Sequence, residues 1–367
     1  MIFTIDILAL LICTFTIILA RRNSNMDPHK SRHIIKAATL TFVIIVLECI
    51  TILCENSQNY KIFLFYRLVN AFGFSMTPLV IINLAMLYWS KIKKYKTLLF
   101  IPFLINAFLS FASVKTGWIF YVSTLNEYSR GPLFILQTLC SAIYYIVLVY
   151  CSFRELKSYD REDQTLLGFI FMIIAFGVTM QIIFPTFLFI WGSVAVSILL
   201  YYVFLRELQF RYDPMTKVFN RAVFEKHMEL LSNSDNIQVI VMDINNLKLI
   251  NDNYGHLEGD FLISESAKII EQSFKGIGRI YRIGGDEFCI LIEHLSLNDI
   301  EQYIRIFQRL ISDYNSNSSA KFNIEIAYGI SEFIKENKKN LYEVFTEADN
   351  EMYKCKDMMK KYKLLQE

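Results

Sequence analysis

Carboxylates stand at two places in the C-terminal half of the chain where they have little structural purpose. Asp243 lies at the end of the strongly apolar run IQVIVMDI, and Asp286 and Glu287 follow a pair of glycines, Gly284 and Gly285. Mg²⁺ binds hard oxygen donors such as carboxylates while it keeps several of its waters. Adjacent glycines in a turn let the backbone approach a phosphate. The two places together predict a metal and phosphate site; the alternative is a solvated strand end and a polar turn.

Polar residues in two further segments could extend this site. Asn251 and Asp260 follow the first carboxylate along the chain, and either of them could instead cap a helix. Lys356 and Lys360 are four residues apart, so they share one face of the final helix. Lys248 could contact a phosphate or lie on a solvated face.

Strands and helices alternate from residue 212 onward. Short apolar runs predict buried strands, and longer amphipathic stretches predict helices. The glycine pair between two short strands indicates a hairpin. This pattern predicts an α+β domain in which helices pack on a mainly antiparallel sheet. The expected helices cover 215–232, 259–275, 298–314 and 341–360, and the expected strands cover 237–244, 279–283, 287–293 and 322–330.

The N-terminal half has a different composition. Hydrophobic residues make up 54% of the chain and concentrate before residue 206. A helix needs about 20 apolar residues to cross a bilayer, where each segment must satisfy its own backbone hydrogen bonds. We therefore expect an all-α seven-helix transmembrane bundle at 1–205, a helical linker at 206–214 and a soluble domain at 215–367. The seven apolar runs cover roughly 2–20, 34–54, 62–89, 97–114, 132–152, 165–185 and 187–205, with Pro185 and Thr186 as a tight hairpin between the last two.

Lys and Arg residues in the loops indicate the orientation of the bundle. One alternate set of loops carries eleven of them and the other set carries three. Because positively charged loops stay in the cytoplasm, we expect a multi-pass protein of the cell membrane with its N-terminus outside and its soluble domain in the cytoplasm. The net charge of +2 and the lack of a dense basic stripe argue against a nucleic-acid partner.

Two features of the bundle bear on signalling. The run VSILLYYVFLRELQFR at 196–211 keeps its apolar spacing into the soluble domain, so a continuous helix could transmit a movement or act as a passive tether. Asp6, Glu48 and Arg67 lie in the first three spans, and charges there are usually paired or face water. Glu48 and Arg67 could form an ion pair, the three could line an outward pocket for an extracellular or membrane ligand, or they could snorkel without function.

The chemistry-bearing runs resemble the sequence blocks of one family. The run GGDEF at 284–288 resembles the motif that gives the GGDEF family of diguanylate cyclases its name. The segment 243–260 is similar to that family's second block, and DPMTKVFNR at 213–221 is similar to its first. Residues 327–331 and 348–356 resemble its late strand and final helix. Five blocks in order cover about residues 212–361, whereas the membrane half resembles only a multi-spanning sensory region.

The resemblance implies a role for each site residue. Asp243 and Asp286 would hold two Mg²⁺ ions per active site, where Mn²⁺ could replace them, and the Ile244 carbonyl would complete one coordination shell. Glu287 would stand beside them as a further catalytic residue. The other implied substrate contacts are Asn251 and Asp260 to guanine, Gly284 and Gly285 to the phosphates at the turn, and Lys248, Lys356 and Lys360 to the triphosphate oxygens.

The implied reaction condenses two GTP molecules into cyclic di-GMP and two pyrophosphates. The 3′-hydroxyl of one GTP attacks the α-phosphate of the other, so a homodimer is required. Three residues depart from the family pattern: Lys217 and Met359 replace glycines, and Lys360 replaces an arginine, which keeps the charge but loses the bidentate grip on phosphate. The family's product-inhibition motif would fall at Lys275 and Gly278 and is absent, so we expect no feedback inhibition through that locus.

Two other functions fit part of the sequence. A catalytically degenerate domain could bind GTP or cyclic di-GMP and act as a receptor. A transporter with a regulatory tail is the second, but the odd number of spans and the lack of an evident inverted repeat weigh against it.

Overall fold

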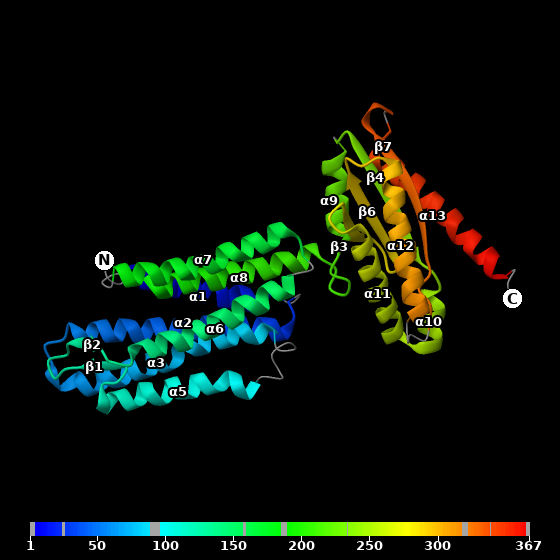
Figure 1. Cartoon of the computed structure of the whole chain (residues 1–367). Helices are drawn as coiled ribbons and strands as arrows, with labels where there is room; N and C mark the ends of the chain where they lie inside the picture. The colour runs from blue at the N-terminus through cyan, green and yellow to red at the C-terminus, as the bar shows by residue number, and fades with distance from the viewer. Residues whose placement is uncertain are drawn as a thin grey trace. The chain divides into compact units, whose positions relative to one another are not determined.

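The computed structural model describes residues 4–23, 26–88, 96–156, 159–184, 189–232, 234–317, 322–337 and 339–364. The chain forms two compact units, Met1–Arg206 and Glu207–Glu367 (Figure 1). The first unit is helical, and the second combines helices with a sheet.

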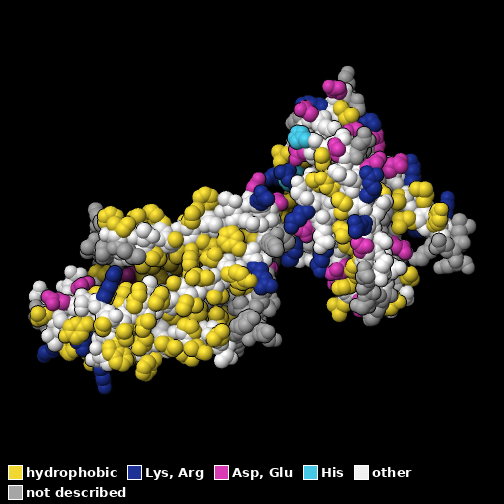
Figure 2. All heavy atoms as spheres, viewed as in Figure 1, with side chains coloured by type: hydrophobic (Ala, Val, Ile, Leu, Met, Phe, Trp, Pro, Cys, Tyr) yellow, Lys and Arg dark blue, Asp and Glu magenta, His cyan; other side chains and the backbone are white. Residues whose placement is uncertain are grey.

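The first unit contains the expected membrane helices. Seven helices among the described residues are long and apolar enough to cross a bilayer, which confirms the seven-span prediction. Hydrophobic side chains cover much of the visible surface of this unit (Figure 2), as a lipid-facing bundle requires. The Pro185–Thr186 hairpin lies outside the described residues. The helices are α1 (Thr4–Arg22), α2 (Pro28–Glu55), α3 (Phe63–Ala85), α5 (Lys96–Thr116), α6 (Phe134–Glu155), α7 (Arg161–Ile183) and α8 (Phe189–Arg211).

A short hairpin that the sequence analysis did not predict determines the environment of Arg67. Strand β1 (Phe120–Val122) pairs antiparallel with β2 (Tyr128–Arg130). The Arg67 guanidinium donates from Nε to the Val122 carbonyl at 2.8 Å and from Nη1 to the Val114 carbonyl at 3.3 Å. Its charge is thus bound by backbone oxygens, and the described residues show no ion pair between Arg67 and Glu48.

The second unit is a five-stranded sheet with helices on both faces. The strand order is β3-β5-β6-β4-β7, and every pairing is antiparallel except that of β3 with β5. This confirms the predicted α+β fold with a mainly antiparallel sheet. The strands are β3 (Phe219–Asn220), β4 (Asn236–Ile244), β5 (Gly278–Arg282), β6 (Glu287–Glu293) and β7 (Ile326–Ile334), and the helices are α9 (Arg221–Leu231), α10 (Leu247–Tyr254), α11 (His256–Phe274), α12 (Leu297–Asn317) and α13 (Leu341–Leu364).

Alternation along the interior strand β4 assigns its side chains to two faces. Ile240, Met242 and Ile244 join a buried core with apolar residues of α11 and α12. The residues between them point to the opposite face, where α13 packs: Gly329 of β7, the register partner of Val241, approaches the α13 backbone. Asp243, two residues after Val241, therefore also lies on the α13 face.

Two elements are clearly displaced from their predicted bounds, and one helix was not predicted. The first helix begins at Arg221 instead of residue 215, because the Asn220 side chain accepts the Val223 N–H at 3.1 Å and caps it. The last strand runs over Ile326–Ile334 and not 322–330. A separate helix, α10, occupies a stretch for which the sequence pattern predicted no element, and Gly255, at φ +89°, ends it.

Candidate active site

Two carboxylates lie side by side where β4 and β6 meet the hairpin. Asp243 of β4 is the register partner of Glu287 of β6. The Glu287 carbonyl accepts the N–H groups of Ile283 at 3.0 Å and Gly284 at 3.3 Å, so its backbone polar groups point towards β5. The pair across β4 and β6 is therefore non-hydrogen-bonded, the kind in which Cα atoms lie only about 4.5 Å apart. The two side chains leave the same face of the sheet close together.

The third carboxylate residue is tied to the end of β4 through its backbone. The Ile244 N–H donates to the Asp286 carbonyl at 3.0 Å. Because the N–H and C=O of one strand residue point to the same side, the Ile244 carbonyl also faces the hairpin. The structure thus places Asp243, Asp286 and the Ile244 carbonyl around one end of the sheet.

Electrostatics at this end of the sheet are dominated by crowded negative charge. Burial raises the pKa of Asp243, whereas the hydrogen bond and charge of Lys356 lower it and the Asp286 carboxylate raises it. Burial also raises the pKa of Glu287, and the carboxylates of Asp286 and Asp243 raise it further. The three carboxylates therefore lie within electrostatic range of one another, and a cation would relieve their repulsion.

A basic residue of the last helix, α13, contacts the carboxylate cluster. The Lys356 Nζ atom lies 2.6 Å from Asp243 Oδ1, and both side chains are largely removed from solvent. Lys360, one turn further along α13, is exposed but close enough to lower the pKa of Asp243. Both predicted lysines of α13 therefore lie at the carboxylate cluster.

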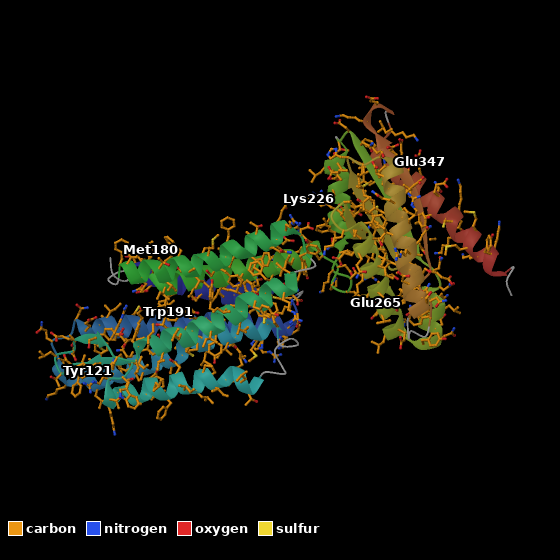
Figure 3. All side chains as sticks on the ribbon, viewed as in Figure 1. Tyr121, Met180, Trp191, Lys226, Glu265 and Glu347 are labelled. Atoms are coloured by element: carbon orange, nitrogen blue, oxygen red, sulfur yellow. The ribbon has the colours of Figure 1, made fainter. Side chains whose placement is uncertain are left out.

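A glycine brings α13 close enough for this contact. A Cβ atom on Gly329 would overlap the Ala348 carbonyl oxygen and the Met352 nitrogen, which are backbone atoms of α13. The start of the helix is also fastened, because Ser331 Oγ donates to Glu347 Oε2 at 3.1 Å and Lys339 Nζ donates to Glu347 Oε1 at 2.6 Å. Figure 3 labels Glu347 on this helix. Sequence reasoning assigned no role to Gly329, although it lies in a matched block.

The hairpin itself is held by an arginine that the sequence analysis also left without a role. Arg282 donates from Nη2 to the Gly285 carbonyl at 2.8 Å and from Nη1 to Asp213 Oδ1 at 3.0 Å. Asp213 in turn accepts from the Thr216 hydroxyl at 2.7 Å. The segment before β3 and the Gly284–Gly285 turn are thus joined by a half-buried ion pair. The hints in the sequence were that Asp213 begins a matched block and that Arg282 lies two residues before the Gly284–Gly285 pair.

Comparison with known proteins identifies the domain that contains these residues. Residues 210–361 match the family model described as diguanylate cyclase, GGDEF domain. These residues form a GGDEF domain.

Relatives of the GGDEF domain include named cyclases. The diguanylate cyclase VdcA of Vibrio cholerae is 30% identical over 153 residues, which are 40% of this chain and 44% of that protein. The diguanylate cyclase DgcS of Shewanella oneidensis is 28% identical over 157 residues, 41% of this chain and 51% of that protein. The chain thus spans about half the length of these curated relatives. Among solved structures, the GGDEF domain of DgcB from Caulobacter crescentus is 22% identical, covering 40% of this chain and 90% of that one with a TM-score of 0.36.

The residues expected to contact guanine lie on a second part of the GGDEF domain. Asn251 is on α10 and Asp260 is on α11, and these helices pack against each other. A Cβ on Gly259 would overlap Asn251 Oδ1, so the glycine lets Asn251 lie against the first turns of α11. Asp260 and Lys248 are exposed, which leaves them open to a ligand. The two helices bring the pair Asn251 and Asp260 together; their contact with guanine stays a prediction.

The donor set of the GGDEF domain fits a divalent cation with oxygen ligands. No group of three or more His, Cys, Asp or Glu side chains among the described residues is arranged to hold a metal by itself. Mg²⁺ in phosphate chemistry needs only one or two carboxylates, because water and substrate phosphates supply the other ligands. Asp243, Asp286 and the Ile244 carbonyl match that requirement.

A half-buried histidine makes the stability of the GGDEF domain sensitive to acid. His227 Nδ1 lies 2.7 Å from the Tyr281 hydroxyl. Burial, followed by the charges of Arg279, Arg211 and Lys226, lowers the pKa of His227 to about 4. Unfolding would restore an ordinary pKa of about 6.5, so the unfolded chain binds the extra proton between about pH 6.5 and 4 and stability falls as the pH falls.

We expect this loss to be about 1 kcal/mol, discounted because the ring is only half buried. Urea unfolding of residues 206–367 across that pH window measures it, and His227→Phe should flatten the slope. His256→Gln, at an exposed histidine of α11, is the matched control and should keep the slope. An identical slope in the wild type and in His227→Phe would contradict the assignment.

Proposed function

We propose that this protein is a diguanylate cyclase that condenses two GTP molecules into cyclic di-GMP and two pyrophosphates under the control of its membrane region. The observation that carries the proposal is the carboxylate cluster of Asp243, Asp286 and Glu287 at one end of the sheet, with Lys356 at 2.6 Å from Asp243. Named diguanylate cyclases among the relatives support it.

Different residues of the site would bind the metal ions and the triphosphate during phosphoryl transfer. Asp243, Asp286 and the Ile244 carbonyl would hold two Mg²⁺ ions. Bound Mg²⁺ neutralises charge on the triphosphate and polarises the phosphate under attack. Lys356 and Lys360 add positive charge beside the same carboxylates, and they would bind triphosphate oxygens.

The Gly284–Gly285 turn would bind the phosphates of GTP. A Cβ on Gly284 would overlap Glu287 Oε2, so the glycine leaves room for the Glu287 carboxylate beside the turn. Gly285 has open space where a side chain would be, and the Arg282 contact fixes its carbonyl. Arg282 therefore acts as a positioning residue that orients the backbone of the turn. On α10 and α11, Asn251 and Asp260 would select guanine, because a carboxylate can accept from the N1–H and the 2-amino group.

Each domain would present one GTP, so that two domains must face each other for bond formation. A homodimer is therefore part of the proposed mechanism, and the specific activity should rise with the protein-to-lipid ratio at low density. The proposed topology has the GGDEF domain in the cytoplasm, where GTP is available.

The test is turnover of GTP by the full-length protein in lipid nanodiscs with Mg²⁺, with the product identified by mass spectrometry. Formation of cyclic di-GMP supports the proposal. Tight binding of GTP or cyclic di-GMP without turnover, in a sample shown to contain two subunits per nanodisc, would replace it with the receptor function.

Lys356 gives a prediction about pH. Because its charge and hydrogen bond lower the pKa of Asp243, Lys356→Met should raise that pKa further. The ionised form of Asp243 then requires a higher pH, so the acidic limb of the pH–rate profile should move upward and the rate should fall by about tenfold or more. Initial rates between about pH 5 and 8 measure both effects.

The control for Lys356→Met lies on the same helix. Lys354 forms an exposed ion pair with Glu351 at 2.7 Å, and Lys354→Met should leave the profile unchanged. An acidic limb at the same pH in the wild type and in Lys356→Met would refute the link to Asp243.

A further inference from the structure

Two acidic residues lie inside the membrane unit, and the described residues offer no hydrogen-bond partner to their buried side-chain oxygens. Asp6 of α1 is completely buried, and neither Oδ1 nor Oδ2 has a hydrogen-bond partner. Glu48 of α2 has a buried Oε2 that is also unpaired, and it lies within electrostatic range of Asp6. The two helices pack against each other. Two carboxyl groups are thus enclosed together in an apolar bundle.

Among the described residues, no basic group acts on either carboxyl group. An apolar cluster formed by α1, α2 and α8 includes Cys13 of α1 and Cys49 of α2. Helix α8 contributes Trp191 and Ala195 to this cluster, and neither of these side chains carries a charge. The neighbouring helix α3 carries Arg67, but its guanidinium is bound to the Val122 and Val114 carbonyls. Among the described residues, none that packs here can neutralise the pair.

Physical chemistry does not allow both carboxyl groups to stay ionised in this setting. An uncompensated charge in a low-dielectric interior costs several kcal/mol, and like charges close together add repulsion. The complete burial of Asp6 and its two unpaired oxygens are observations independent of the clustering itself. They indicate a missing positive charge.

We propose that Asp6 and Glu48 form a binding site for a single positive charge within the membrane unit, supplied either as a proton or as a small monovalent cation. Either source reduces the charge of the ionised pair from −2 to −1, removes the repulsion between two like charges, and can be shared by oxygens of both carboxyl groups. The site lies in the first turn of α1 and in the last two turns of α2, near one end of the bundle.

The site is placed where its occupancy can act on the last membrane helix. Trp191, labelled in Figure 3, and Ala195 of α8 pack in one cluster with Ala9 and Ile45 of the two acidic helices. A Cβ on Gly192 would lie 2.9 Å from the Ile5 side chain, so α1 and α8 approach closely beside Asp6. Loss of the bound charge would separate these helices or let water enter between them. Because α8 continues without a break to Arg211, such a change would act on the whole helix.

The experiment uses the full-length protein in lipid nanodiscs and needs no cyclase assay, so its outcome is independent of the proposed function. Infrared spectroscopy near neutral pH detects the carbonyl band of a protonated carboxyl group. Thermal unfolding in NaCl, compared with N-methyl-D-glucamine chloride at equal ionic strength, detects a bound small cation. The double variant Asp6→Asn, Glu48→Gln keeps the side-chain shapes and removes both charges. Glu55→Gln, at the exposed last residue of α2, is the matched control.

A protonated-carboxyl band that the double variant loses and Glu55→Gln keeps would assign the charge to a proton. A rise in Tm of several degrees with Na⁺, present in the wild type and the control but lost in the double variant, would assign it to a cation. The proposal is overturned if the wild type shows neither signal, or if the double variant keeps the same signal. Glu48→Gln alone provides the same comparison if the double variant does not fold.

Discussion

Asp286→Ala in the full-length protein should lower the rate of cyclic di-GMP formation by about a hundredfold or more. Asp286 lies at the hairpin beside Asp243 and Glu287, and its backbone carbonyl is bound by the Ile244 N–H at 3.0 Å. The substitution leaves that backbone bond in place and removes only the carboxylate, so a proposed metal ligand is lost while the turn is kept. The rate of product formation in nanodiscs at saturating Mg²⁺ and GTP measures the effect.

The control for this variant lies before the start of β4, whereas the carboxylate cluster lies at the end of that strand. Asp235 precedes β4, and its side chain is 90% exposed in a long 4.0 Å pair with Lys335. Asp235→Ala should keep the wild-type rate within about twofold, because an exposed pair contributes little. If Asp286→Ala retained full activity, the proposal that the carboxylate cluster takes part in catalysis would be wrong.

Gly329→Ala should destabilise the GGDEF domain by about 1–3 kcal/mol and lower its activity strongly. The added methyl group would overlap the Ala348 carbonyl oxygen and the Met352 nitrogen. These are backbone atoms, so the side chains cannot rotate away and α13 must move off β7. That movement would carry Lys356 away from Asp243. Urea unfolding of residues 206–367 measures the stability, and product formation by the full-length protein measures the second effect.

Gly285→Ala is the control for the stability measurement. An added Cβ at Gly285 meets nothing within 4 Å, so the unfolding midpoint should not change. Unchanged stability in Gly329→Ala would show that α13 can retreat from the sheet without loss, and Gly329 would then have no role in positioning Lys356.

Much of the fold could be predicted because it depends on local patterns. The membrane spans follow from the length of apolar runs alone, and the strands at 237–244 and 287–293 follow from unbroken apolar runs beside a glycine turn. The helix start at Arg221 was missed because the Asn220 cap competes with the amphipathic pattern before it. The last strand lies four residues later than expected because its position is fixed by pairing with β4.

The site was predictable as a set of residues but not as an arrangement. Asp243 and Asp286 were expected to meet, and the structure brings them to one end of the sheet. The 2.6 Å contact of Lys356 with Asp243 depends on how closely α13 packs, which Gly329 permits. The support of the turn by Arg282 and Asp213 joins positions far apart in the sequence. Contacts of this kind arise only from tertiary packing, and the periodicity of apolar residues in the sequence does not predict it.

The unbroken helix α8 implies a rule for how other input regions could be joined to this domain. An α-helix turns by about 100° per residue, so a residue inserted near Gln209 would rotate everything that precedes it by that angle relative to Tyr212. Four inserted residues would nearly restore the original phase, whereas two would reverse it. Chimeric proteins built at this point should therefore alternate between responsive and unresponsive with the period of the helix, so spacing matters there more than side-chain identity.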